Sequence, residues 1–364
     1  MDNKPNEENE LDELKKMLSK FYPKYPEPIN YSKHIGDNYT LGFRHSKDII
    51  NGDKNYSPTL MQLKIHKEYI KYLSSLDPIK LENNMKNFNF DNIKDMNDND
   101  IFEKIKSILF VDGKFNFSSK TEVYKPGQIL YRARKLNNYN IPNDKLSCLQ
   151  DFWNPPKEYV LKPSRLNNIG ESLLYTSIYM SIYGHSQILK EINIKMHDCY
   201  VICIYKTIKP IHTVPIGKYF NNDGAFKITD KKQLQVHKLI CEFMKRIFSV
   251  PVDEGNEYLY RLSNLIAKTF YLLPKEDMDA WEYPTVKTEN EEDNDIKNAN
   301  LCFIPDKAME KLRLVAVCLG IDRDAYNINL FPKYVAYSFD ENGMPIYVEA
   351  REDEMAELQR RLYT

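Results

Sequence analysis

The chain has 364 residues, of which 42% are hydrophobic and 28% are charged, and its formal net charge is -1. This length suits one large domain or one domain with substantial extensions, and the balanced charge excludes a global basic field that would attract nucleic acid or an anionic membrane. The polar start, MDNKPNEENELDELKK, lacks the apolar region of a signal peptide, and no apolar run is long enough to span a membrane. We therefore expect a soluble, cytoplasmic protein that contacts neither nucleic acid nor membrane directly.

Residues 1–122 are predicted to form a helical N-terminal region with mobile loops. The polar residues before Leu11 are expected to be disordered. Apolar residues at helical spacing predict one helix over 11–21 and a second between Pro58 and Asp77. The segment 83–100 is rich in Asn and Asp, which is typical of a surface loop.

From about Val123 the pattern changes to short β-branched and aromatic runs that alternate with helical runs, which predicts one domain over 123–320. The predicted strands are QILYRAR (128–134), SLLYTS (172–177), CYVICIYKTI (199–208) and LRLVAVCLG (312–320). The predicted helices cover the second half of 181–192, a run capped by Asp230, and 257–273. This mixed order predicts an α+β fold, followed by a C-terminal extension over 321–364 with a strand and a helix.

The cysteines form no Cys-x-x-Cys pair and mostly lie in apolar runs, so we expect buried free thiols and a reducing compartment. They are Cys148, Cys199, Cys203, Cys241, Cys302 and Cys318. Cys199 and Cys203 share one side of a predicted strand, but no second pair of ligands follows them, so a zinc site there is weakly supported. We expect a protein without a metal.

Candidate ligand-binding residues lie between residues 130 and 290. Arg132 and Arg134 alternate along a predicted strand and therefore project from one face of the sheet. Arg165 lies in a polar turn with Asn167, and Tyr175 lies in the strand that follows. Arginine binds phosphate oxygens through a planar fork, and tyrosine offers a flat ring and one hydroxyl.

Two further candidates complete this set. Glu191 lies on the next predicted helix, and Thr285 lies in the sequence WEYPTV (281–286), which we expect to form a compact turn. A carboxylate can stabilise positive charge that develops on a nearby sugar. The set suits a nucleotide whose bond breaks through a cationic sugar. Each residue alone also fits an ordinary role, as a surface arginine, a core tyrosine, a solvated helix charge or a turn residue.

The order of these motifs resembles the RES family, named for Arg, Glu and Ser. The matching segments are ILYRAR, FWNPPKEYVLKPSRLNNIGESLLYTS, ILKEI, DAWEYPTV and NANLCFIPD. The family pattern has a Gly-Arg-x-Asn-x-x-Gly turn, a Leu-Tyr strand, a helical Glu, a Tyr-Pro-Ser turn and a strand led by Asn. Here Ser164 replaces the first glycine and Thr285 replaces the serine. The resemblance covers residues 123–320.

The resemblance implies a mixed β-sheet core like that of ADP-ribosyltransferases, with flanking helices. It also implies an enzyme that consumes NAD+ without a metal, by releasing nicotinamide and transferring the ADP-ribosyl group to water or to inorganic phosphate. Many members of the family are toxins, each silenced by a cognate antitoxin that carries a DNA-binding module. We therefore expect NAD+ as the substrate and an antitoxin protein as the partner. The sequence leaves the oligomeric state open.

The resemblance also implies roles for the candidate residues. Glu191 would stabilise the positive ribose, Arg165 would hold the pyrophosphate, and Tyr175 would stack on nicotinamide or bind the ribose. The remaining candidates would bind NAD+ at the wall of the site: they are Arg132, Arg134, Asn167 and Thr285. Two alternatives stay open, a protein ADP-ribosyltransferase and a degenerate RES-like scaffold that binds a nucleotide or partner without cleaving it.

Overall fold

A computed structural model describes residues 60–112, 115, 121–136, 146, 148–178, 188–189, 191–192, 194–219, 227–253, 255–271, 278–285, 299–321 and 332–363. The helix predicted over 11–21 lies outside these residues. The described part combines helices with one large mixed sheet, so the predicted α+β class is confirmed. The division of the chain at residues 122 and 320 stays a prediction.

The α-helices and the short 3-10 turns are spread along the described part of the chain. The helices are α2 (Leu60–Ser75), α3 (Pro78–Lys86), α4 (Asp98–Leu109), α6 (Lys231–Ser249), α7 (Tyr260–Phe270), α8 (Pro305–Lys311) and α9 (Glu352–Tyr363). The 3-10 turns are η2 (Asp91–Asp95), η3 (Leu149–Phe152), η4 (Lys157–Tyr159) and η6 (Glu257–Leu259). Ile188, Leu189 and Glu191 are also helical, as the sequence predicted.

The strands form a ten-stranded sheet in the order β1-β5-β6-β7-β3-β2-β4-β8-β9-β10. They are β1 (Glu122–Tyr124), β2 (Ile129–Leu136), β3 (Leu174–Ile178), β4 (Cys199–Thr207), β5 (Ile211–Pro215), β6 (Ala280–Tyr283), β7 (Ala299–Phe303), β8 (Leu312–Ile321), β9 (Tyr334–Ala336) and β10 (Val348–Glu349). β5 and β6 run parallel, and the other neighbouring pairs run antiparallel. The four predicted strands are present as β2, β3, β4 and β8.

The register of the central strands assigns side chains to the two faces of the sheet. Tyr131 of β2 lies opposite Ser177 of β3, and Tyr175 of β3 lies opposite Cys302 of β7. Residues opposite each other in a ladder share a face, and successive residues alternate between faces. One face therefore carries Tyr131 and Tyr175, and we call it the tyrosine face. The other carries Arg132 and Arg134, and we call it the arginine face.

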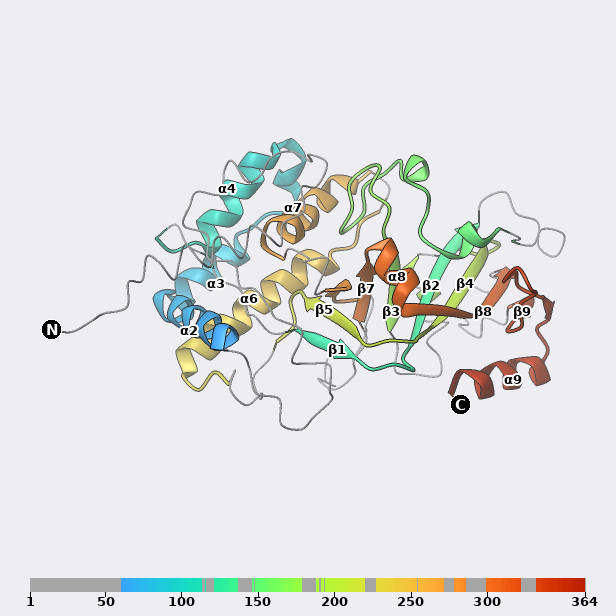
Figure 1. Cartoon of the computed structure of the whole chain (residues 1–364). Helices are drawn as coiled ribbons and strands as arrows, with labels where there is room; N and C mark the ends of the chain where they lie inside the picture. The colour runs from blue at the N-terminus through green and yellow to red at the C-terminus, as the bar shows by residue number, and fades with distance from the viewer. Residues whose placement is uncertain are drawn as a thin grey trace.

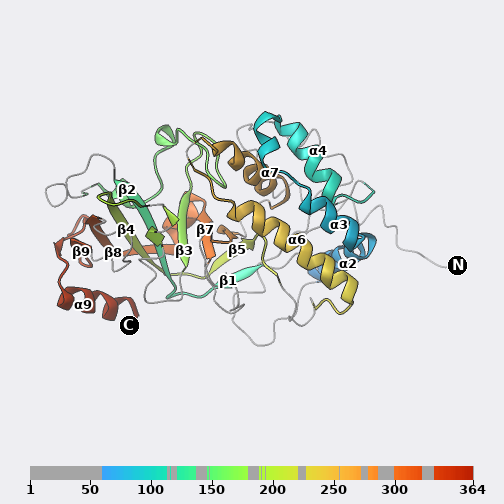
Figure 2. The ribbon, with the colours of Figure 1, turned by 180° about the vertical axis from the view of Figure 1, so that it is seen from behind.

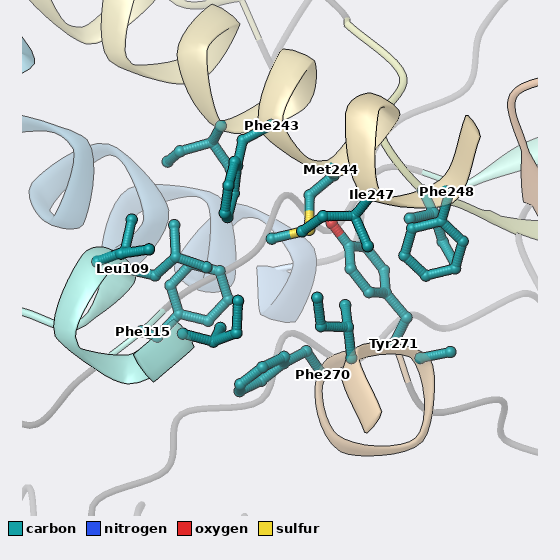
Figure 3. Close-up of a cluster of buried hydrophobic side chains, with 14 of the residues drawn as sticks. Leu109, Phe115, Phe243, Met244, Ile247, Phe248, Phe270 and Tyr271 are labelled. Carbon is teal, nitrogen blue, oxygen red and sulfur yellow. The ribbon is translucent and has the colours of Figure 1, made fainter. Parts of the chain in front are cut away.

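Most helices cover one end of the tyrosine face. Figures 1 and 2 show α2, α3, α4, α6 and α7 gathered at that end of the sheet, with α9 at the opposite end. A single hydrophobic cluster joins these helices to β6 and β7 through Trp281 and Cys302. In Figure 3, Phe243 and Met244 of α6 approach Phe270 and Tyr271 at the end of α7. The amphipathic α6, capped by the Asp230 side chain, was predicted from the sequence and is confirmed.

The other end of the tyrosine face has its own core. Ile188 and Leu189 pack there with Leu358 of α9 and with Tyr200 of β4. Gly320 lies opposite Tyr200 in the ladder and leaves room for its ring, because an added Cβ would lie 2.3 Å from the ring. The predicted C-terminal helix is confirmed as α9. The strand-like PIYVEA contributes only the short β10.

The predicted end of the second helix at Asp77 is confirmed, since α2 ends at Ser75, but the helix that follows was not predicted: the Asp77 side chain caps α3, with Pro78 in the first turn. Two other sequence predictions were wrong in detail. The Asn- and Asp-rich segment 83–100 contains η2 and the start of α4, where Asn97 and Asp100 form a capping box. Asn and Asp favour caps as strongly as loops, because their short side chains bond to free backbone N–H groups.

The second error concerns 281–286, which begins as strand β6 rather than as a turn. Five cysteines are buried free thiols, as predicted, whereas Cys148 is exposed. Among the helices that the structure describes, none has the length and apolar character needed to cross a bilayer.

Candidate functional site

The polar turn that carries Arg165 is held by its own hydrogen bonds. The backbone N–H of Ser164 donates to the Asn167 carbonyl at 3.0 Å, and the N–H of Gly170 donates to the Val160 carbonyl at 2.9 Å. Gly170 has φ +76°, a conformation that glycine adopts without the usual steric cost. The turn is therefore a defined structure that presents Arg165.

Helix α7 ties this turn to the rest of the protein. The buried Asn264 donates through Nδ2 to the Ser164 carbonyl and, at 3.2 Å, to the Asn167 carbonyl. One turn further along α7, Lys268 forms an ion pair with Glu171. Contacts with α7 therefore hold the backbone in place on both sides of Arg165.

The Arg165 guanidinium is only partly used by the protein. Its Nη2 donates to the Val250 carbonyl at 2.6 Å, and its Cζ lies 5.7 Å from the centre of the Tyr260 ring. Its Nη1 is shielded from solvent and donates to no atom of the described residues. A buried N–H group without an acceptor is costly, so this unpaired group is unusual in a folded protein.

Tyr175 points from β3 onto the tyrosine face, beside this turn. Its hydroxyl donates to Asn167 Oδ1 at 2.8 Å and accepts from the Leu166 N–H at 3.0 Å. Burial raises the pKa of the Tyr175 phenol well above its ordinary value, and Cys302 and Tyr283 raise it further. The hydroxyl has already donated its single hydrogen, so the ring rather than the hydroxyl is available for a ligand.

Tyr283, at the end of β6, carries a phenol whose pKa is affected by two of the candidate charges. Burial raises the pKa of its phenol first, and Cys302 adds to that rise. The positive charge of Arg165 opposes the rise in this pKa, whereas the negative charge of Glu191 adds to it. Both charged groups therefore lie close enough to Tyr283 to act on its hydroxyl.

The three residues predicted to be catalytic are Arg165, Tyr175 and Glu191, which come from a turn, a strand and a helix. Each of them interacts electrostatically with Tyr283 on the tyrosine face. Asn167 is only 2% exposed, so it does not line the site. Its side chain accepts a hydrogen bond from the Tyr175 hydroxyl and thereby orients Tyr175. Thr285 is also buried, two residues beyond Tyr283.

A buried polar pair in the same region was not predicted. Ser177 of β3 donates to Asn300 Oδ1 of β7, and Asn300 Nδ2 donates to the Pro284 carbonyl at 3.5 Å. The register places Tyr283, Asn300, Ser177 and Tyr131 in one row across β6, β7, β3 and β2. The pair fixes the end of β6, and with it the position of Tyr283.

Arg132 and Arg134 are not part of this site. They do project from one face of β2, as predicted, but that face is the arginine face, opposite Tyr175. Arg134 Nη2 lies 3.3 Å from Asp151 Oδ1, and Arg132 Nη1 donates to the Asp151 carbonyl at 3.5 Å. We expected these arginines to bind the same ligand as Arg165. They lie on the opposite face of the sheet from Tyr175, so they do not join that site.

Glu282 is also on the arginine face. Its carboxylate accepts from Thr213 Oγ1 at 2.8 Å and pairs with Lys218 Nζ at 2.8 Å. Although its neighbours Trp281 and Tyr283 face Tyr175, this carboxylate does not reach that side of the sheet. Glu191 is therefore the acidic candidate that the fold brings to the tyrosine face.

Potential metal ligands do not cluster in the part of the chain that the structure describes, where no three His, Cys, Asp or Glu residues form a metal-binding group. Cys199 and Cys203 lie apart along β4 in the hydrophobic cluster of the arginine face.

The chain was also compared with known proteins. No protein-family model, no curated protein and no solved structure matches it. Membership of the RES family therefore stays a prediction based on the order of the motifs.

Proposed function

We propose that this protein cleaves the nicotinamide–ribose bond of NAD+ on the tyrosine face, with Arg165, Tyr175 and Glu191 at the reacting end of the substrate. The observation that carries the proposal is geometric: the turn that presents Arg165 is hydrogen-bonded to Tyr175 through Leu166 and Asn167, on the tyrosine face. Arg165 and Glu191 come from separate elements, and the charges of both affect the pKa of Tyr283 on that face. A cation for phosphate and an anion for a positive sugar are what this substrate requires.

The chemistry follows from the charges of the substrate. When the bond between ribose C1′ and the pyridinium nitrogen breaks, both electrons go to the nitrogen, and nicotinamide leaves as a neutral molecule. No general acid is needed. The ribose becomes positively charged, and the Glu191 carboxylate stabilises it. An oxygen of the acceptor then bonds to C1′ and, if the acceptor is water, loses a proton to solvent.

The binding roles follow from which groups are already occupied. Arg165 Nη1 has no acceptor among the described residues, so it is the group that would contact a phosphate oxygen of NAD+. The Tyr175 hydroxyl is held by Asn167 and Leu166, so the ring would pack against nicotinamide or ribose. Asn167 would act through Tyr175, and Thr285 would bound the site near Tyr283.

We further propose an ADP-ribosyltransferase-like fold and membership of the RES family. Their support is that three motifs quoted for the family supply the residues that interact electrostatically with Tyr283. A role as a toxin, and an antitoxin partner, follow only from the family resemblance. They would be tested by growth arrest on expression and by co-purification with the product of a neighbouring reading frame.

The proposed activity is tested by incubating the purified chain with NAD+, with and without inorganic phosphate, and measuring free nicotinamide. Release in water alone identifies a glycohydrolase, and release that requires phosphate identifies a phosphorylase. Transfer of label from NAD+ to protein identifies a protein ADP-ribosyltransferase. If nicotinamide is released under none of these conditions, the proposal is wrong and a binding scaffold is the better account.

Glu191→Gln tests the assignment of the carboxylate, because the amide keeps the shape and removes the charge. We expect nicotinamide release to fall at least about a hundredfold, as is usual when a preorganised charge in an active site is removed. Glu310→Gln is the matched control, because Glu310 forms an exposed pair with Lys209. Activity of the Glu191 variant within a few-fold of the unsubstituted chain would remove Glu191 from the mechanism.

A further inference from the structure

Tyr260 is the aromatic residue that lies against the Arg165 guanidinium, and no sequence motif had pointed to it. It is the first residue of α7, and Arg165 Cζ lies 5.7 Å from the centre of its ring. A guanidinium within about 6 Å of a ring centre is attracted to the face of the ring. Arg165 Nη2 also donates to the carbonyl of Val250, the residue that caps the end of α6, at 2.6 Å. Two helices therefore hold one guanidinium, α6 through a hydrogen bond and α7 through a ring.

The guanidinium is held without an acidic partner. Among the described residues, no carboxylate forms an ion pair with Arg165. Glu257, three residues before Tyr260, is already occupied: it pairs with Lys162 at 3.2 Å and accepts from the Gly255 N–H at 2.8 Å. A carboxylate would neutralise the guanidinium, whereas a neutral ring leaves its positive charge in place. Arg165 is thus fixed in position while it keeps the charge that an anionic ligand needs.

The side chain of Tyr260 offers its ring to Arg165, while its hydroxyl is not engaged. Burial raises the pKa of the Tyr260 phenol, and the positive charge of Arg165 opposes that rise. The hydroxyl of Tyr260 forms no hydrogen bond with the described residues, and the residue as a whole is half-buried. A phenylalanine at this position would therefore keep the contact with Arg165, whereas a leucine would remove it.

We propose that Tyr260 is a positioning residue, whose ring fixes the direction of the Arg165 guanidinium so that it meets the pyrophosphate of NAD+. This inference rests on the proposed function, because that function assigns the pyrophosphate to Arg165. It goes further in naming a residue outside every quoted motif on which binding depends. ADP-ribose carries the same pyrophosphate and has no bond to nicotinamide, so its binding can be measured apart from cleavage.

The first test is the dissociation constant for ADP-ribose, measured by titration calorimetry. Tyr260→Leu should weaken binding about tenfold, which is the effect of losing one cation–π contact to a partly desolvated guanidinium. Tyr260→Phe should bind within about twofold of the unsubstituted chain, because the ring is kept. Rescue by phenylalanine separates the ring contact from a role of the hydroxyl.

Tyr258→Leu is the matched control. Tyr258 lies two residues earlier, in η6, and is also half-buried, but its ring lies over no cation of the described residues. The substitution removes an aromatic ring from the same segment and leaves the partner of Arg165 unchanged. ADP-ribose should therefore bind this variant within about twofold of the unsubstituted chain.

The second test is urea unfolding, which needs no ligand. Arg165→Gln should lower the urea midpoint less in the Tyr260→Leu background than in the Tyr260→Phe background, because only the ring interacts with the guanidinium. Equal shifts in the two backgrounds would overturn the inference. The midpoints also show whether each variant is folded before its binding is compared.

Three binding results would overturn the inference as well. They are a Tyr260→Leu variant that binds ADP-ribose as tightly as the unsubstituted chain, a Tyr260→Phe variant as weak as Tyr260→Leu, and an unsubstituted chain that does not bind ADP-ribose. A chain that binds ADP-ribose but releases no nicotinamide contradicts the proposed cleavage alone. The comparison of leucine with phenylalanine then still decides the role of Tyr260.

Discussion

Asn264 of α7 should be a main source of order in the Arg165 turn. In Asn264→Ala the Ser164 carbonyl loses its donor, and the Asn167 carbonyl keeps only the N–H of Ser164. Each hydrogen bond contributes about 1 kcal/mol net. The Ser164 carbonyl is only part-buried, and the substitution also removes the buried Asn264 Oδ1, which has no partner among the described residues. We therefore expect the free energy of unfolding to fall by about 2 kcal/mol, the sum of the two lost hydrogen bonds.

Ser263→Ala is the matched control on the same helix. Ser263 is 1% exposed, and its Oγ donates to the Tyr260 carbonyl at 3.2 Å, one turn earlier in the chain. That bond joins two residues of α7 and does not reach the Arg165 turn, so its loss should cost no more than about 1 kcal/mol. Urea unfolding followed by circular dichroism gives both values.

Hydrogen exchange tests where the stability is lost. In Asn264→Ala the amides of 160–172 should exchange faster than in the unsubstituted chain, whereas the amides of β4 (Cys199–Thr207) should change little. The reasoning is refuted if the two substitutions cost the same, or if exchange in 160–172 is unchanged. Either result would mean that the turn is ordered without α7.

Two further predictions concern stability. Gly217 and Gly170 both have positive φ, +71° and +76°. A Cβ on Gly217 would lie 2.7 Å from the Lys245 backbone nitrogen. A Cβ on Gly170 would meet no atom within 4 Å. Gly217→Ala should therefore destabilise the protein by clearly more than the roughly 1 kcal/mol expected of Gly170→Ala, measured by urea unfolding, and equal costs would contradict this. Burial raises the folded-state pKa values of Tyr175 and Tyr283, while unfolded phenols ionise near about 10. Since the unfolded chain then releases protons that the folded chain keeps, stability should fall as the pH rises above about 10, and a flat urea midpoint between about pH 9 and 11 would contradict the burial of these hydroxyls.

Much of the fold could be predicted because its signals are local. Long runs of β-branched and aromatic residues identify β4 and β8, and a capping Asp230 ahead of an apolar stripe identifies α6. The short β5, β9 and β10 have few residues to carry a pattern. They are strands because their backbones pair with neighbouring strands of the sheet. The capping box at Asn97 was overlooked because its residues are also typical of loops.

The candidate site was only partly predictable for a different reason. Alternation along β2 shows that Arg132 and Arg134 share a face, but it does not say whether Tyr175 shares that face too. The answer depends on the register of β2 against β3, which rests on the single pair Tyr131 and Ser177. The bond between Ser177 and Asn300 joins positions far apart in the sequence, so no local pattern could reveal it.

The central claim is that Arg165 and Glu191 act on one substrate molecule in one site. A double-mutant cycle tests it most directly, with kcat/KM for nicotinamide release measured for the unsubstituted chain, Arg165→Lys, Glu191→Gln and the double variant. Residues that act as a unit give strongly non-additive effects, so the double variant should be about as slow as the slower single variant. Effects that multiply in full, or a single variant at the unsubstituted rate, would contradict the account.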